Sequence, residues 1–335
     1  MSTQPNQEWL EKATLVTSDL TGGTDGGLLS PQQSESFLRV AIDYTTMVKE
    51  ARNEFSNSPS FEVPRLSFGS RILKPGTEGT RLVDGDRVKP TTGLASLSTV
   101  LVKGEVPVSD EVFEDNIEKD RMADTIMAMV AEGVGRDIEE LFWKGDTDRT
   151  GAEDTYLDLI NGWIAQAQDN FPAAQKIDTD ASGGPTTYDG LFAKMVESLP
   201  ARYRRDYTRL RFYVPVFHRD KYQASLAARG TGLGDQAVME NMNARLAFRG
   251  IPVREVPVAT GSDNVNTVSV NWERFALLVD PMNLIVGWHR RVRIEKWRDP
   301  REGATSFVVS ARCDTKYGDP SAGVLAFDIP TAGLG

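Results

Sequence analysis

The side chains that most often carry acid–base or metal chemistry are scarce in this sequence. It holds two histidines, His218 and His289, and one cysteine, Cys313. His218 stands at the start of an expected helix and His289 within an expected strand, where a histidine is more often structural than a general base. A lone cysteine forms no intramolecular disulfide, and no cysteine–histidine cluster offers zinc ligands. The sequence therefore argues against an enzyme and predicts no catalytic residue, cofactor or metal.

Two loops have the composition of ligand-binding loops but lack the residues that would complete them. Asp146-Thr147-Asp148 resembles the start of a calcium loop, yet Leu157 stands where the bidentate glutamate belongs. The stretch 230–234 is rich in glycine, but it follows an expected helix and lacks the lysine and hydroxyl residue of a phosphate-binding loop. Both stretches are predicted to be ordinary loops.

The composition is that of a folded globular protein. The chain has 335 residues, of which 40% are hydrophobic and 26% charged. No run reaches about 18 consecutive apolar residues, so neither a membrane-spanning helix nor a membrane partner is expected. The N-terminus lacks the basic start and apolar run of a secretory signal. The single cysteine suits a reducing cytosol.

Charge is spread unevenly along the chain. The net charge is −10, and residues 109–185 hold six basic and nineteen acidic residues, a net charge of −13. Residues 61–108 have a net charge of +2 and residues 186–335 of +5. Such blocks favour head-to-tail self-association, in which a positive segment of one copy meets a negative segment of the next. A chain this acidic is a poor candidate for tight wrapping of nucleic acid.

Residues 61–108 are predicted to form a long β-hairpin with no visible core of its own. Its return arm alternates two sets of side chains, and the tip between Pro75 and Pro90 holds three glycines and three acids. Arms of about 12 residues would span about 40 Å. Because an isolated two-stranded ribbon is marginal in water, we expect this hairpin to be an arm that reaches a neighbouring subunit.

The strongest helix is expected over 117–144. Apolar residues recur there at three- and four-residue steps, and Gly145 stands where a C-terminal cap belongs. One face is expected to be buried against strands of a C-terminal hairpin: Ile126, Val130, Val134 and Ile138. An unpaired aspartate in place of Val134 would then abolish folding.

Short helices and strands fill the rest of the chain. A helix is expected at 34–55, and strands at 209–216, 274–279, 283–297, 306–312 and 323–329. The strands are expected to pair mostly through hairpins rather than βαβ crossovers, which makes the fold class α+β.

Several stretches recur in the same order and at the same spacing in one known family. They are Phe-Trp-Lys-Gly-Asp at 142–146, Asp-Leu-Ile-Asn-Gly at 158–162, Phe-Arg-Gly-Ile-Pro-Val at 248–253, Val-Pro-Val at 256–258, and Asp280-Pro281 leading to Ile294-Glu295. With the order of the elements, they make almost the whole chain resemble the major capsid proteins of tailed bacteriophages. The resemblance implies the Hong Kong 97-type capsid fold.

The resemblance also implies a division into domains. These are an N-terminal arm at 1–60, the extended hairpin loop (E-loop) at 61–108, a peripheral domain at 109–185 with the spine helix 117–144, an axial α/β domain at 186–279, a long peripheral hairpin at 280–315, and a C-terminal strand at 316–335 that returns to the axial domain.

The function implied is that of a structural subunit. Hexamers and pentamers of the chain would assemble in the host cytoplasm into the icosahedral head shell of a virion, which encloses double-stranded DNA. Implied partners are a separate scaffolding protein, a portal and decoration proteins, with weak interior contacts to packaged DNA. Alternatives are an encapsulin-like shell of the same fold and a self-associating soluble enzyme.

Intersubunit contacts are expected on the two long hairpins: Arg65, Arg71, Arg81, Arg87 and Lys89 on the first, and Asp299, Arg301 and Glu302 on the second. The arginines at 202, 204, 205, 209 and 211 are interpreted as partners in intersubunit ion pairs rather than as DNA contacts. Some family members join a lysine to an asparagine at the second tip, but residues 298–303 contain no asparagine. Lys74 and Lys89 therefore lack the partner for this crosslink.

Overall fold

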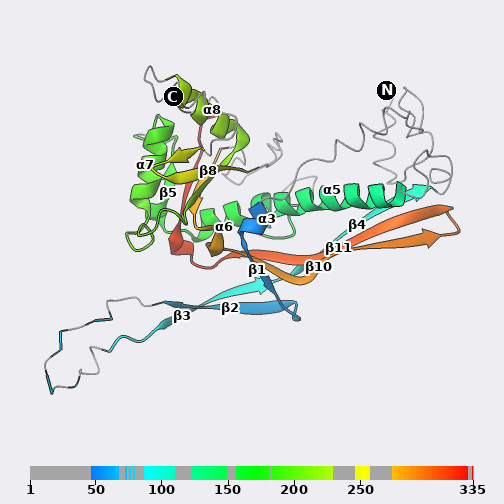
Figure 1. Cartoon of the computed structure of the whole chain (residues 1–335), viewed down its shortest axis with the longest axis horizontal. Helices are drawn as coiled ribbons and strands as arrows, with labels where there is room; N and C mark the ends of the chain where they lie inside the picture. The colour runs from blue at the N-terminus through cyan, green and yellow to red at the C-terminus, as the bar shows by residue number, and fades with distance from the viewer. Residues whose placement is uncertain are drawn as a thin grey trace.

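The computed structural model describes residues 47–67, 87–109, 122–148, 156–181, 183–228, 246–256 and 274–330, together with positions 72, 73, 75, 76, 78, 79, 81 and 334. These residues form a compact lobe, a four-stranded sheet that runs along a long helix, and a two-stranded ribbon that projects from this sheet (Figure 1). Arg71, Lys74 and the loop 230–234 lie outside the described residues. No helix within the described ranges is long and apolar enough to cross a membrane.

The four-stranded sheet has the order β1-β10-β11-β4. Its strands are β1 (Arg52–Phe55), β10 (Leu284–Asp299), β11 (Ala304–Tyr317) and β4 (Val100–Ser109). Strand β1 runs parallel to β10, and β11 is antiparallel to both β10 and β4. Helix α5, Met122–Lys144, lies along this sheet (Figure 1). The helix ends where the sequence predicted, and its first five predicted residues lie outside the described part.

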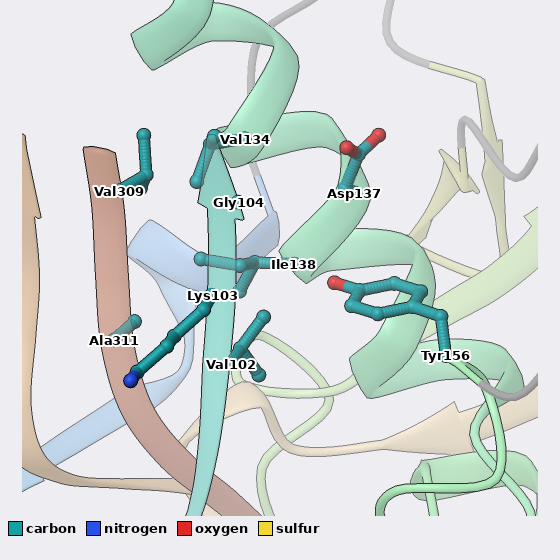
Figure 2. A pocket seen from close by; sticks show the side chains of 9 residues that line it. All are labelled: Val102, Lys103, Gly104, Val134, Asp137, Ile138, Tyr156, Val309 and Ala311. Carbon is teal, nitrogen blue, oxygen red and sulfur yellow. The ribbon is translucent and has the colours of Figure 1, made fainter. Parts of the chain in front are cut away.

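Helix α5 packs less tightly at its centre than the sequence predicted. Ile126 and Ile138 are buried, but Val130 and Val134 are half-buried. Val134 lines a cavity of about 170 Å³ between α5, β4 and β11, opposite Val309 (Figure 2). An aspartate at position 134 would meet this cavity rather than a filled core. The structure therefore does not support the expectation that Val134→Asp abolishes folding.

The compact lobe is built on a mixed six-stranded sheet. Its order is β5-β12-β9-β6-β8-β7, with β5 Lys176–Asp178, β12 Gly323–Phe327, β9 Ala276–Val279, β6 Arg211–Pro215, β8 Ile251–Val256 and β7 Ala247–Phe248. Helices α7, Tyr188–Ser198, and α8, Val216–Ala227, pack against it. The inner strands β9 and β12 are almost entirely apolar because both of their faces are covered.

Several strands of this part differ from those expected from the sequence. Strand β5 pairs in parallel with β12, so the lobe's sheet begins at 176 rather than after 186. Strand β11 continues to Tyr317, beyond the predicted end of the second hairpin at 315. Strands β6 and β8 are parallel, with α8 between them in the chain, so this pair is an exception to the hairpin pairing expected for most strands. Strand β5 has only three residues, so its sequence is too short to show the alternation of apolar and polar residues that predicts a strand.

The helix expected at 34–55 ends early. Within the described residues, helix α3 covers Met47–Glu50 and the chain then enters β1. Strand β1 pairs with β10 in the register that places Arg52 opposite Ile285. Hydrogen bonds to a distant strand thus override the local helical pattern, which is a weak signal by comparison.

An aromatic cluster connects α5 to the lobe. The ring centroid of Trp143 lies 5.0 Å from that of Trp163, in helix α6 (Trp163–Asn170), 5.4 Å from Tyr213 of β6 and 6.1 Å from Phe275. All four side chains are buried. Ring packing of this kind contributes beyond the area it buries and resists sliding of the helix against the lobe.

Glu139 of α5 is buried and contacts the start of α3. Its Oε1 accepts a hydrogen bond from the Met47 amide at 3.0 Å. Burial raises the pKa of Glu139 to about 7, although the Met47 amide and Lys49 act to lower it. The folded state thus holds the proton more tightly than the unfolded chain. We expect the free energy of unfolding to fall as the pH rises from about 4.5 to about 7.

Glu139→Gln tests this expectation because glutamine keeps an oxygen acceptor for Met47 and cannot ionise. Urea unfolding across the same pH range should show a flatter profile for this variant than for the native protein. The exposed Glu105→Gln is the matched control and should keep the native profile. If Glu139→Gln also keeps it, another group sets the pH dependence.

Candidate intersubunit ribbon

The ribbon consists of β2, Ser60–Ser67, and β3, Thr91–Ser98, paired antiparallel with Ser60 opposite Ser98. Each strand has eight residues and spans about 26 Å. The predicted arms of 12 residues are wrong because the chain breaks at Thr99 and continues as β4, which pairs with β11 rather than with β2. Residues 100–108 therefore belong to the four-stranded sheet and not to the hairpin.

The base of the ribbon packs on its own subunit. Val63 and Leu97 are buried against Ile285 of β10, with Phe61 beside them. A Cβ placed on Gly287 would lie 2.6 Å from Leu97 Cδ2 and 2.9 Å from Phe61 Cζ, so glycine is needed for this close approach. The Ser98 amide donates to Asp314 Oδ2 at 2.7 Å. The inner ribbon thus has the core contacts that its sequence did not reveal.

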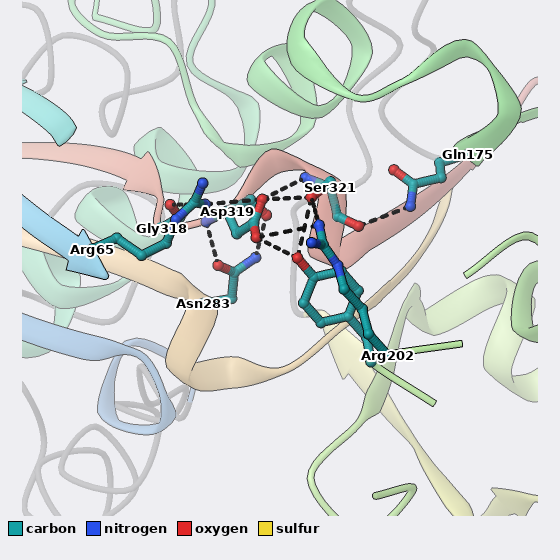
Figure 3. A network of polar contacts seen from close by, with 8 residues as sticks. Arg65, Gln175, Arg202, Asn283, Gly318, Asp319 and Ser321 are labelled. Atoms are coloured by element: carbon teal, nitrogen blue, oxygen red, sulfur yellow. Dashed lines mark hydrogen bonds and ion pairs between the residues drawn. The ribbon is translucent and has the colours of Figure 1, made fainter. Parts of the chain in front are cut away.

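Arg65, further out on β2, contacts a polar network in its own subunit (Figure 3). Its Nη1 donates to the Gly318 carbonyl at 2.7 Å and lies 2.9 Å from Asp319 Oδ1. The sequence predicted Arg65 as an intersubunit contact, but the structure pairs its guanidinium within the subunit. Neither partner could be found from the sequence, since both lie near the other end of the chain.

Asp319 is the centre of this network. Its carboxylate accepts from the amide and hydroxyl of Ser321, at the start of the 3-10 helix η7, Pro320–Ala322. The hydroxyl of Tyr203, in the lobe, donates to the same carboxylate. Burial alone would raise the pKa of Asp319, but the hydrogen bonds from Ser321 and Tyr203 and the charge of Arg65 outweigh it and hold the pKa below its usual value. The group is therefore ionised at neutral pH.

Apolar side chains are exposed on β3 of the ribbon and beyond its paired strands. Leu73 is 82% exposed, Leu94 60% and Ile72 56%. The predicted contact residues Arg81, Arg87 and Lys89 are exposed as well.

The second predicted contact region is the turn between β10 and β11. Arg301 and Glu302 are exposed there, and the Asp299 carboxylate accepts from the Arg301 amide at 2.8 Å. Trp297, near this turn, is 57% exposed. The turn and the ribbon point to opposite ends of the molecule (Figure 1), so one subunit does not bring the two regions together.

The other residues singled out in the sequence have structural roles. Nδ1 of buried His218 lies 2.9 Å from the Tyr188 hydroxyl, and His289 Nδ1 lies 3.2 Å from the Ser56 carbonyl. Asp146 Oδ1 accepts from the Asp148 amide, and the described residues contain no cluster that would hold a metal ion. Of the arginines, Arg202 and Arg209 form ion pairs within the subunit, with Asp319 and Asp280 respectively.

The sequence is similar to that of a curated capsid protein. It is 32% identical over 322 residues to the putative prophage capsid protein YqbE of Bacillus subtilis (strain 168), across 95% of this chain and 96% of that protein. No family model matches the sequence.

Solved structures are similar at low sequence identity. A chain of the satellite phage P4 procapsid that includes the size determination (Sid) protein matches with a TM-score of 0.59 at 13% identity, over 90% of this chain and 100% of that one. The capsid of a native GTA particle matches with a TM-score of 0.56 at 14% identity, over 85% and 91%. A Mycobacterium phage Adephagia chain also gives 0.56 at 14%, over 90% and 96%. These matches confirm the predicted α+β fold of the Hong Kong 97 type.

Proposed function

We propose that this chain, which belongs to the capsid protein family of tailed bacteriophages and is a subunit of the phage head shell, closes that shell by laying its ribbon on a neighbouring subunit. Family membership makes the protein a self-associating structural component of the virion and not an enzyme. What remains to be established is which surfaces join the subunits.

The observation that carries the proposal is the exposure of Ile72 and Leu73, beyond the paired strands, and of Leu94 on β3. A two-stranded ribbon needs a covered apolar face to be stable. Strand β10 covers the inner part of the ribbon, but no described residue covers these three side chains. Exposed apolar side chains that gather in one patch mark contact surfaces. A second copy of the chain would supply the missing cover.

The ribbon and the β10–β11 turn suit heterologous contacts that close into a shell, since they lie at opposite ends of the molecule. We assign neighbour contacts to two sets of residues: Arg71, Arg81, Arg87 and Lys89 at the ribbon, and Asp299, Arg301 and Glu302 at the turn. The four-stranded sheet with α5 would be the peripheral domain, and the six-stranded lobe the axial domain, at the centre of hexamers and pentamers.

Other partners follow from the same proposal. Assembly in the host cytoplasm would use a separate scaffolding protein, a portal and decoration proteins, and the finished shell would touch its DNA only weakly. The net charge of −10 supports the last point, because an acidic subunit neutralises few phosphates.

Negative-stain microscopy of the purified protein is the direct test of the proposal. Closed particles of uniform size, built by the chain alone or with a scaffolding protein, are the expected result. A small soluble oligomer under every assembly condition would contradict it.

Assembly rate should depend on salt. The basic side chains at the ribbon would approach the acidic 109–185 segment of a neighbour, and exposed ion pairs are each worth about 1 kcal/mol or less. Many such pairs steer association, and salt screens them over about 10 Å at 0.1 M ionic strength. Light scattering should therefore show slower assembly at 0.5 M than at 0.05 M salt, by about tenfold.

An Arg81→Gln/Arg87→Gln variant separates this steering from other salt effects. Its assembly should be slower at low salt and almost independent of salt. Arg249→Gln/Arg254→Gln removes the same charge from the lobe and serves as the control, with native salt dependence. Equal rates for the native protein at both salt concentrations would mean that apolar and backbone contacts alone drive association.

A further inference from the structure

The carboxylate of Asp319 connects three parts of the subunit that are distant in sequence. Arg65 reaches it from the ribbon, Tyr203 and Arg202 from the lobe, and Ser321 from the segment between β11 and β12. The side chain of Asp319 is 16% exposed and that of Arg65 37%. Figure 3 shows Arg65 pointing from β2 toward Asp319, with Arg202 on the other side.

The backbone around Asp319 is also held. Asn283, just before β10, accepts from the Asp319 amide at 2.6 Å and donates to the Asp319 carbonyl at 2.9 Å. The Gly318 amide donates to the Asn283 carbonyl at 2.9 Å. Asp319 therefore sits on the rigid connection between the two sheets, and a side chain bound to it is fixed relative to both.

Arg65 gives the ribbon a second point of attachment. The first is the base, where Val63 and Leu97 pack on Ile285 and Ser98 bonds Asp314. On β2, Arg65 is two residues beyond Val63, a distance of about 7 Å along the strand. A ribbon attached only at its base can swing about it, whereas two separated attachments define a direction.

The opposite strand leaves room for this contact. Gly93 pairs with Arg65 across the ribbon, and a Cβ on Gly93 would lie 3.2 Å from both Nε and Nη2 of Arg65. A larger residue at position 93 would press on the guanidinium. One guanidinium nitrogen, Nη1, makes both contacts: it donates to the Gly318 carbonyl and lies beside the Asp319 carboxylate.

We infer that Arg65 and Asp319 form a latch that sets the direction of the ribbon in the free subunit, before any neighbour is bound. The latch acts as a positioning device: it presents the outer ribbon at one angle to the lobe and so selects where on a neighbour the ribbon arrives. This inference rests on the proposed function of the ribbon. Without the latch, the contact forms at variable angles and the curvature of the shell is no longer uniform.

The test measures ribbon direction in unassembled subunits. Cysteines replace two exposed residues, Glu78 on the ribbon and Glu197 on α7, and each carries a fluorophore. The native Cys313 is fully buried and is therefore not labelled. Single-molecule energy transfer should give one narrow distribution for the latched subunit. Arg65→Ala and Asp319→Asn should each broaden the distribution, and Arg65→Lys, which keeps the charge at the end of a differently shaped side chain, should broaden it less than Arg65→Ala.

Arg52→Ala is the matched control, because it also removes an exposed ion pair, with Glu54 of β1, away from the ribbon. It should keep the narrow distribution. Gly93→Ala, which leaves both latch residues in place, should broaden the distribution without changing any charge. A narrow distribution in Arg65→Ala, or an equal broadening in Arg52→Ala, would overturn the latch.

Assembly provides the second readout. Arg65→Ala should melt at the native temperature but form shells of mixed size, whereas the native protein forms shells of one size. Native shells from this variant would overturn the role of the latch in assembly. The proposed function is tested separately, by removal of the ribbon tip, which leaves Arg65 and Asp319 untouched.

Discussion

Deletion of residues 76–89 should give a folded, soluble subunit that forms no closed shells. The described positions in this range are exposed or half-buried, so the body of the subunit loses little by the change. The paired strands end at Ser67 and Thr91, and the buried base at Val63 and Leu97 remains. The deletion removes the tip of the ribbon with the proposed contact residues Arg81, Arg87 and Lys89, and it leaves Ile72, Leu73 and Leu94 in place. A heterologous contact that is missing from every subunit leaves the shell open.

The measurements are thermal unfolding, which should match the native protein, and the yield of closed particles in the microscope, which should fall to zero. A glycine–serine segment of equal length in place of 76–89 keeps the reach but removes the side chains, and it should also fail to assemble. Hydrogen exchange adds a further check: the outer ribbon should exchange rapidly in free subunits and slowly in particles. Normal shells from either variant would show that the ribbon does not join subunits.

The end of α5 and the order of the elements could be predicted from the sequence because the signals are local. Gly145 marked the end of the helix, and the structure supplies a stronger reason for it than helix capping. A Cβ on Gly145 would lie 2.4 Å from the Ile160 carbonyl and 2.6 Å from that of Leu141. The alternation of residues 94–103 likewise predicted strand correctly, but it did not show that the chain changes partner at Thr99.

The contacts that hold the ribbon could not be predicted, since they join segments far apart in the chain. Arg65 has the exposure pattern of a surface residue on a strand, and nothing nearby in the sequence indicates that Asp319 is its partner. The need for glycine at positions 287 and 93 could not be predicted either. A neighbouring side chain at close range requires these glycines, and not a turn. Sequence periodicity predicts the elements, whereas the latch depends on how the two sheets are placed.

Trp143→Ala should have the largest effect on the stability of the free subunit. The side chain is fully buried at the junction of α5, α6 and the lobe's sheet. Its Nε1 has no hydrogen-bond partner within the described structure, so the variant loses packing and no hydrogen bond. Large-to-small changes of this kind cost about 3–5 kcal/mol, because rings such as those of Trp163 and Phe275 cannot collapse into the space. Domains are stable by only about 5–15 kcal/mol, so much of the stability would be lost.

Trp297→Ala is the matched control, because it makes the same substitution at a side chain that is 57% exposed. Urea unfolding followed by circular dichroism should show a change within about 0.5 kcal/mol for this variant. The two variants should separate folding from assembly: Trp143→Ala lowers the unfolding midpoint, whereas Trp297→Ala leaves it unchanged and lowers the yield of particles. A loss below about 1 kcal/mol for Trp143→Ala would mean that the aromatic cluster does not hold α5 to the lobe. The spine helix would then be positioned mainly by its contacts with β11, and shell subunits could flex at this junction.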